Sequence, residues 1–170
     1  MKLQTLEDLL VHQIQDILSA EHQVSKALPR MAEAAGSEEL RQAFQDHHQE
    51  TDTQIERLRK ALELLEKPVS ASHCEAAEGL ITEAEEYLDG EGNRDVLDAA
   101  IITAAQRFEH YEIAAYGSAI SFARKLNREE VARLLEESLE EEKAADEKLN
   151  SIAENGVNDA AMKAGSDKSR

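Results

Sequence analysis

Cysteine, proline, glycine and aromatic residues are all scarce in this sequence of 170 residues. The single cysteine, Cys74, cannot close an internal disulfide, and a metal site built from thiolates would need more sulfur. Tryptophan is absent, and three tyrosines and three phenylalanines leave little for an aromatic binding platform. Only seven glycines and two prolines occur, whereas alanine, leucine and glutamate are abundant. This composition is typical of helices, so the sequence predicts an all-α protein.

Basic residues are also few, and their shortage limits the partners that the chain can bind. Nineteen lysines and arginines face 36 aspartates and glutamates, which gives a net charge of −17. Such a surface repels phosphate backbones, so nucleic acid is not expected as a partner. No apolar run approaches the roughly 20 residues that a membrane span needs, and no basic stretch followed by an apolar one suggests an export signal. We therefore expect a soluble, cytoplasmic protein.

Apolar residues recur at helical spacing in four long stretches. The first ends before Gly36, where Gly36 and Ser37 supply a stop and the N-cap of the next helix. The second runs to about Glu66, the third from about Asp95 to Leu126, and the fourth from Arg128 to about Glu154. The sequence therefore predicts four long helices.

The link between the second and third long helices has about 30 residues and contains the pattern of one short helix around residues 80–88. A link of this length permits a crossover between two helical hairpins, which is the connection of ferritin-like bundles. We therefore predict a ferritin-like four-helix bundle with an extra short helix, forming one domain over residues 1–156. Residues 157–170 are small and polar and are expected to form a flexible tail.

The two halves of the chain align with one another. A shift of 88 positions places Ile14 on Ile102 and Glu21 on Glu109, and a shift of 91 places Glu50 on Glu141. Helical sequences of low complexity align by chance fairly often, but this alignment pairs a glutamate on every long helix. The pattern indicates that two copies of one helical hairpin each place carboxylates at corresponding positions.

A carboxylate that faces an apolar core costs several kcal/mol unless it is paired or binds a metal. Two iron or manganese ions prefer hard oxygen ligands together with some imidazole, and a bundle supplies these from facing helices. Further residues of this kind lie close to the aligned glutamates, at helical spacing or directly adjacent. The candidate metal ligands are therefore Glu21, His47, Glu50, Glu109, Glu112, Glu141 and Glu142.

Each candidate also has a simpler explanation. Glu21 can lie at an exposed edge of the bundle if its helix is rotated, and His47 can be a hydrogen-bonded core histidine. Glu141 and Glu142 belong to a run of three acidic residues, which usually forms a solvated face, and the spacing does not decide which of the two faces inward. No catalytic residue and no organic substrate can be identified from the sequence.

Four stretches resemble one known family: SAEHQVSKALPRMAEAA, HHQETDTQIERL, AAQRFEHYEIAAYGSAI and LLEESLEEEKAADEKL. They are similar to the YciE/YciF-type ferritin-like proteins of bacteria over roughly residues 3–157. The resemblance implies a ferritin-like bundle, often a homodimer, linked to the stress response and described as a di-iron protein without an established reaction. It also places Thr53 and Ala144 where the wider ferritin-like pattern has histidine, and so implies a site with less imidazole.

The leading hypothesis is a di-metal carboxylate protein that binds two iron or manganese ions per chain and reacts with oxygen or peroxide during stress. The alternative is a non-catalytic helical scaffold or partner-binding dimer in the stress response. The sequence does not decide whether the chain is an enzyme, which metal it binds, or which protein partner it has.

Overall fold

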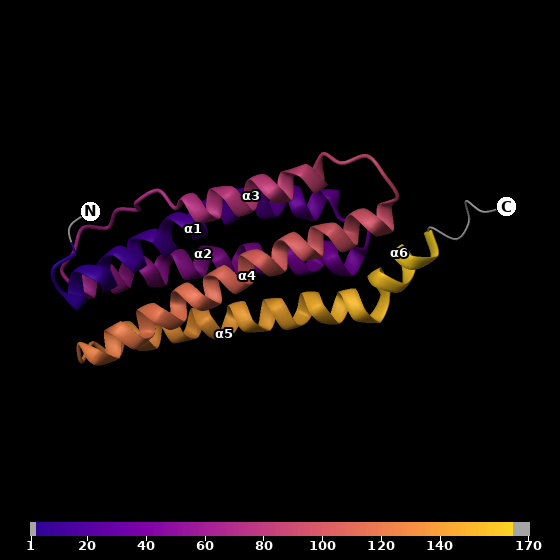
Figure 1. The fold of residues 1–170 in the computed structure, drawn as a ribbon. Helices are drawn as coiled ribbons and strands as arrows, with labels where there is room; N and C mark the ends of the chain where they lie inside the picture. The colour runs from indigo at the N-terminus through magenta and orange to yellow at the C-terminus, as the bar shows by residue number, and fades with distance from the viewer. Residues whose placement is uncertain (1–2, 165–170) are drawn as a thin grey trace.

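Four long helices pack side by side along their length. The computed structural model describes residues 3–164, and in this part of the chain the regular structure is entirely helical. The long helices are α1 (Leu6–Ala34), α2 (Glu38–Leu64), α4 (Arg94–Lys125) and α5 (Glu129–Ile152). Helices α1 and α2 form one antiparallel hairpin, and α4 and α5 form another (Figure 1). The prediction of an all-α protein is confirmed.

Local sequence signals begin and end these helices. Thr5 and Ser37 cap α1 and α2 by accepting a hydrogen bond from a backbone N–H of the first turn, and Asn93 does the same for α4. At the other end of α4, Asn127 has a positive φ of 56°, and the next backbone N–H, of Arg128, donates to a carbonyl in the last turn of the helix. This bond closes α4 in a Schellman motif and lets the chain turn sharply into α5.

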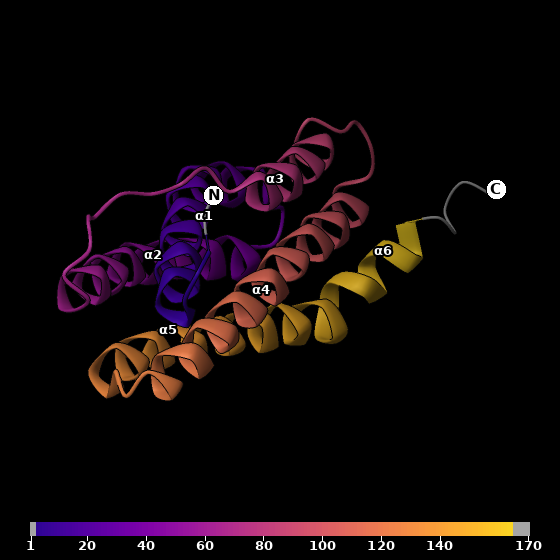
Figure 2. The ribbon, with the colours of Figure 1, turned by 60° about the vertical axis from the view of Figure 1, so that its left-hand side comes forward.

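The link from α2 to α4 carries the short helix α3 (Glu75–Leu88) back along the bundle. Figures 1 and 2 show α3 lying over α1 and α4, and as a result α2 and α4 run in the same direction. The apolar residues Ala77, Leu80 and Ile81 of α3 pack on the core. At the surface, Arg30 on α1 pairs with Glu85, and Arg107 on α4 pairs with Glu83. The link therefore places α3, in addition to the four long helices, against the side of the bundle formed by α1 and α4.

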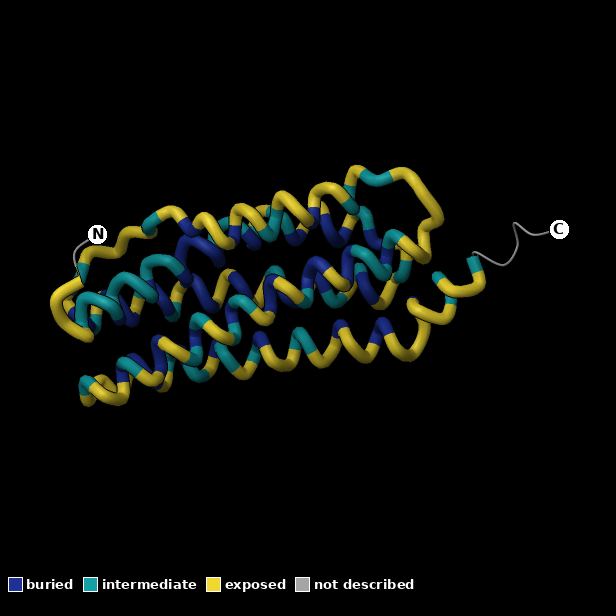
Figure 3. The backbone as a smooth tube through the Cα atoms, in the orientation of Figure 1, coloured by how far each residue is buried: buried dark blue, intermediate teal, exposed yellow. Residues whose placement is uncertain are grey.

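A layer of buried polar side chains divides the core into two apolar clusters. One cluster contains Phe44 and Phe108, and the other contains Leu58 and Tyr116. Between the two clusters each long helix contributes at least one buried polar residue to the middle of the bundle. Figure 3 shows that the helices turn their buried faces toward one another and their exposed faces outward.

The chain continues as helix beyond α5, which differs from the expected tail. A π-helical turn, η1 (Ala153–Val157), leads into α6 (Asn158–Ala164). Val157 is buried and belongs to the apolar cluster around Phe44, so it holds this segment against the bundle. The flexible tail expected from residue 157 is thus helical as far as Ala164, and residues 165–170 lie outside the described residues. Within residues 3–164, no helix is both long and apolar enough to cross a membrane.

Candidate metal centre

The buried polar layer contains four glutamates, which come from three of the long helices. Glu21 lies on α1, Glu109 and Glu112 on α4, and Glu142 on α5, and each residue is at most 3% exposed. Helix α2 contributes His47, which is 5% exposed. Each of these residues lies on the inward face of its helix, between the residues that belong to one apolar cluster and those that belong to the other. Because the long helices pack side by side, the polar residues form one layer.

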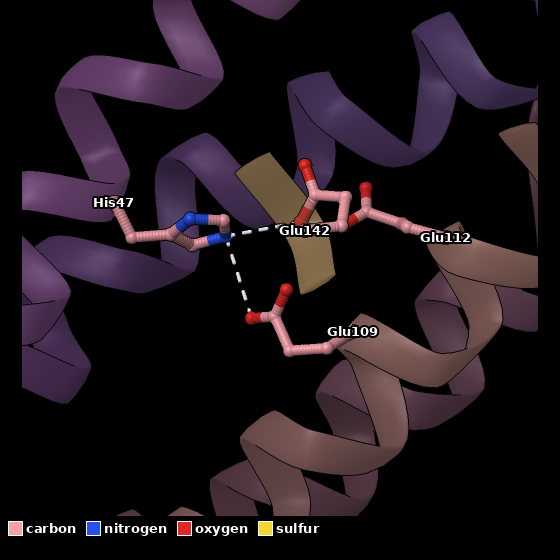
Figure 4. Close-up of side chains that lie close together, drawn as sticks. All are labelled: His47, Glu109, Glu112 and Glu142. Atoms are coloured by element: carbon pink, nitrogen blue, oxygen red, sulfur yellow. Dashed lines mark ion pairs between the residues drawn. The ribbon is translucent and has the colours of Figure 1, made fainter. Parts of the chain in front are cut away.

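His47 lies beside two of these glutamates. Its Nε2 atom lies 3.4 Å from Glu109 Oε1 and 3.7 Å from Glu142 Oε2 (Figure 4). His47, Glu109, Glu112 and Glu142 each offer one ligand atom, and these atoms all lie within 4.8 Å of one another. Glu21 is close enough to interact electrostatically with both His47 and Glu142. Four side chains thus form one close group of oxygen and nitrogen donors, and Glu21 lies beside it; we call the five together the carboxylate–histidine cluster.

Most donor atoms of the carboxylate–histidine cluster lack a hydrogen-bond partner. Both nitrogens of His47 and both carboxylate oxygens of Glu112 are buried without one, and so is one oxygen each of Glu21, Glu109 and Glu142. A buried polar atom left unpartnered costs roughly 1–3 kcal/mol, and more when it carries a charge. The arrangement therefore fits a bound cation, which would satisfy these atoms together.

Burial also changes the acidity of the cluster. It raises the pKa of Glu109 to about 8, an increase to which the nearby Glu21 carboxylate adds. Burial and neighbouring carboxylates likewise raise the pKa values of Glu21, Glu112 and Glu142 well above the usual range. Burial lowers the pKa of His47, but the carboxylates around it outweigh burial and raise the pKa. Without a cation, the cluster holds protons at neutral pH.

Two polar side chains orient the carboxylates of the cluster. The hydroxyl of Tyr116, itself fully buried, donates to Glu21 Oε1 at 2.5 Å. The amide nitrogen of Gln54 donates to Glu142 Oε1 and, at 3.1 Å, to Glu141 Oε2. Each bond fixes one oxygen and leaves the second oxygen of the same cluster carboxylate without a partner. Tyr116 and Gln54 thus direct the free oxygens of Glu21 and Glu142.

The structure separates Glu141 from the other predicted ligands. Its carboxylate forms a two-pronged ion pair with Arg57 on α2, with distances of 2.6 and 2.8 Å from the guanidinium nitrogens. Burial places Glu142 inside the bundle and leaves Glu141 at its edge. Of the two adjacent glutamates, only Glu142 belongs to the cluster.

Glu50 lies at the edge of the cluster. Its side chain is 46% exposed, and its Oε2 atom lies 3.5 Å from His47 Nδ1. Together with Asp46, His47 and Glu109, it lines an open pocket of about 190 Å³ between α2, α4 and α5. Lys148 and apolar residues such as Phe44 complete the lining. We call this pocket, through which acidic side chains and the His47 imidazole are reached from the surface, the polar opening.

Sequence reasoning did not identify Gln54, Arg57 or the role of Tyr116. Gln54 lies seven residues after His47, which places it in the inward stripe of α2. An amide in an apolar stripe is the signal that could have identified it. Tyr116 lies in the core, and its hydrogen bond to Glu21 depends on how α1 and α4 are packed.

The comparisons with known proteins decide the family. The family described as a domain of unknown function, DUF892, matches residues 5–162 of this chain. The chain belongs to the DUF892 family. This result agrees with the resemblance to YciF-type proteins, which the relatives below confirm.

One relative among curated proteins is Protein YciF of Escherichia coli strain K12. It is 44% identical over 162 residues, which cover 95% of this chain and 98% of YciF. The crystal structure of the E. coli stress protein YciF matches with a TM-score of 0.88 over 92% of this chain and 99% of that one. The structure of YcfI from Rhodopseudomonas palustris, called a putative structural protein and 46% identical, matches with a TM-score of 0.87 over 89% of this chain and 97% of that one. These two structures have the same helical fold as this chain.

Proposed function

We propose that the carboxylate–histidine cluster holds two divalent ions, iron or manganese, and that the chain uses them in a reaction with dioxygen or peroxide during stress. The observation that carries this proposal is the set of buried, unpartnered carboxylate oxygens around His47. Four ionised glutamates carry four negative charges, which two divalent cations neutralise. Carboxylate oxygens with one imidazole are a donor set that suits Fe(II) and Mn(II).

Two further observations support the proposal. The long link with α3, which makes α2 and α4 run in the same direction, is the connection found in ferritin-like bundles, whose cores bind metal pairs through inward carboxylates. The similar YciF of E. coli is described as a stress protein. The cluster contains a single histidine, His47. The wider ferritin-like pattern has histidine at the positions of Thr53 and Ala144, and both of these residues are exposed in this chain.

The protein's own side chains would prepare the site in three ways. The four glutamates and His47 would hold the ions, and Glu50 lies beside His47 as a further oxygen donor at the polar opening. Tyr116 donates a hydrogen bond to Glu21, and Gln54 fixes the orientation of Glu142. The apolar clusters above and below the layer exclude water from it. Bound iron or manganese would supply the electrons for the reduction of dioxygen or peroxide.

The test is the metal content per chain after anaerobic loading with Fe(II) and desalting. Wild type, a Glu21→Ala/Glu109→Ala double variant and a Glu86→Ala/Glu91→Ala control are compared, because the control removes two exposed acidic residues of the surface. We expect close to two irons per chain in wild type and control and none in the Glu21/Glu109 variant. Dioxygen and peroxide consumption by the loaded wild type then tests the reaction.

Equal and substoichiometric iron in all three proteins would contradict the metal proposal. Weak binding by surface carboxylates would then account for the metal, and the non-catalytic scaffold or partner-binding dimer would be the better explanation.

A further inference from the structure

A second hollow reaches the carboxylate–histidine cluster between α1, α3 and α4, away from the polar opening. It has a volume of about 150 Å³, and Glu109 lines both hollows. Apolar side chains from all three helices form most of its wall, among them Val24, Leu28, Met31, Leu80, Ile81, Ala84, Ala105 and Phe108. We call it the apolar cavity.

The charged groups of the apolar cavity lie at its two ends. Lys26, Arg30 and Glu85 are exposed and mark its outer end, where Arg30 on α1 pairs with Glu85 and Asp89 from the α3 side. Glu109 is buried and marks the inner end. Between these ends the wall offers almost no hydrogen-bonding group, so water and ions gain little by entering.

We propose that the apolar cavity binds a small uncharged apolar molecule, no larger than about a benzene ring, and presents it to the Glu109 side of the cluster. Enclosed cavities of about 150 Å³ lined by aliphatic and aromatic side chains bind benzene or xenon. The apolar cavity has this volume and this kind of lining, with its outer end open to solvent. The two hollows then have different tasks: cations reach the cluster past Asp46 and Glu50, and the apolar molecule reaches it beneath α3.

Binding in the apolar cavity is independent of the metal, whereas the role of the bound molecule as a reactant rests on the proposed function. The two parts are tested separately. Metal-free protein tests the cavity, and protein loaded with Mn(II) tests whether the bound molecule lies beside the cluster.

The first experiment titrates benzene, and separately xenon, into metal-free protein and follows the methyl signals by NMR. Ala105→Leu and Ala84→Leu fill the cavity from α4 and from α3, and the matched control Ala145→Leu places the same side chain at the polar opening. We expect saturable shifts of the cavity-lining methyl groups in wild type and in the control. Both filling variants should bind at least tenfold more weakly, and the thermal unfolding of each variant shows that it is folded.

Three results would overturn the proposal: no saturable shifts in wild type, filling variants that bind benzene as tightly as wild type, or shifts centred on the other apolar cluster around Leu58. Displacement of benzene by decanoate would also overturn the size limit, because the proposed occupant is no larger than about a benzene ring.

The second experiment measures proton relaxation of bound benzene. Mn(II) in the cluster should accelerate it strongly in wild type, and the Glu21→Ala variant, which leaves the cavity wall intact, should bind benzene without this acceleration. If benzene binds but Mn(II) has no effect while the metal content is normal, delivery to the cluster is excluded. If benzene binds and no metal does, the proposed function fails, but the proposal that the apolar cavity binds a small apolar molecule stands.

Discussion

Glu141 and Glu142 are neighbours in the sequence, yet their carboxylates lie in different surroundings. One residue along a helix corresponds to a rotation of about 100°. This rotation takes Glu142 into the carboxylate–histidine cluster and leaves Glu141 on the seam between α2 and α5, where Arg57 neutralises it. The same residue type is thus a proposed metal ligand in one case and a member of a partly buried ion pair in the other.

Replacement of these two glutamates separately should distinguish their roles. We expect Glu142→Gln to lower the affinity for Mn(II) by about 100-fold or more, because it removes a proposed ligand. Glu141→Gln should lower it by less than about tenfold, since Glu141 reaches the cluster only through Gln54. Mn(II) binding followed by electron paramagnetic resonance measures both. Equal losses would contradict the placement of Glu142 alone in the cluster.

The raised pKa of Glu109 predicts how stability depends on pH. In the metal-free folded protein this pKa is about 8, whereas the ordinary value is 4.5. Between these values the unfolded chain releases a proton that the folded protein keeps, so the free energy of unfolding decreases as pH rises from 4.5 to about 8. One such group contributes a slope of at most about 1.4 kcal/mol per pH unit.

Urea unfolding of the metal-free protein at about pH 5, 6, 7 and 8 measures this slope. We expect Glu109→Gln to reduce the slope without abolishing it, because Glu21, Glu112 and Glu142 have raised pKa values as well. An unchanged slope in this variant would show that Glu109 is ionised throughout the range.

At the scale of elements, α3 is fastened to the bundle at its N-cap. The backbone N–H of Cys74, the N-cap of α3, donates to Ser19 on α1. Its thiol lies 2.9 Å from the hydroxyl of Tyr111 on α4, and this hydroxyl donates to Asp16 on α1 at 2.8 Å. The group formed by Cys74, Tyr111 and Asp16 therefore ties three helices together at the start of α3.

Removal of the Tyr111 hydroxyl should loosen this junction. We expect Tyr111→Phe to lower the free energy of unfolding by about 1–2 kcal/mol, because Asp16 loses a donor while the ring remains packed on Phe108. Tyr87→Phe on α3 is the control, since the Tyr87 hydroxyl makes no hydrogen bond to another residue in the described part of the chain. Urea unfolding at about pH 7 gives both values. A Tyr111 variant as stable as the control would show that the group does not hold α3.

At the scale of the molecule, the polar layer weakens the metal-free bundle at its middle. Four long helices meet there through carboxylates and one imidazole, and most of their donor atoms have no partner. The apolar clusters on either side supply the burial that holds the helices together. A ligand that satisfies the layer would therefore stabilise the whole bundle, because it joins α1, α2, α4 and α5.

Metal should accordingly raise the melting temperature of the whole protein. At Mn(II) concentrations about 100 times the dissociation constant, a single site adds about 2.7 kcal/mol of stability. For a chain of this size we expect a rise of roughly 5–10 °C, which EDTA reverses. Differential scanning calorimetry of wild type and Glu21→Ala, with Mn(II) and with EDTA, is the measurement. If neither Mn(II) nor EDTA changes the melting temperature of the wild type, the result would support a scaffold without a bound metal.

The helices could be predicted from the sequence because their signals are local. Apolar residues at helical spacing, caps such as Ser37 and Asn93, and the long link after Glu66 all act within a few residues. The helix after Gly156 was not predicted, because its composition is polar and Val157 is held by contacts with residues distant in the sequence. Local sequence patterns therefore predict the long helices well. They predict poorly a short helix such as α6, which depends on what its segment packs against.

The carboxylate–histidine cluster could be predicted only in part. The internal repeat identified Glu21 and Glu109, and helical spacing added His47 and Glu112. The spacing did not decide which of two adjacent glutamates on α5 faces inward, and it did not reveal that Glu50 is half exposed, because the rotation of each helix is set by all the residues that it buries.

The sequence by itself determined that this chain forms long helices with acidic residues in their inward stripes, since helix propensity and periodicity are properties of neighbouring residues. The tertiary structure alone decided which carboxylates meet, which one pairs with Arg57, and that Glu109 lies between a polar opening and an apolar cavity. These features depend on distances between residues as far apart as Glu21 and Glu142, and such distances exist only once the helices have packed.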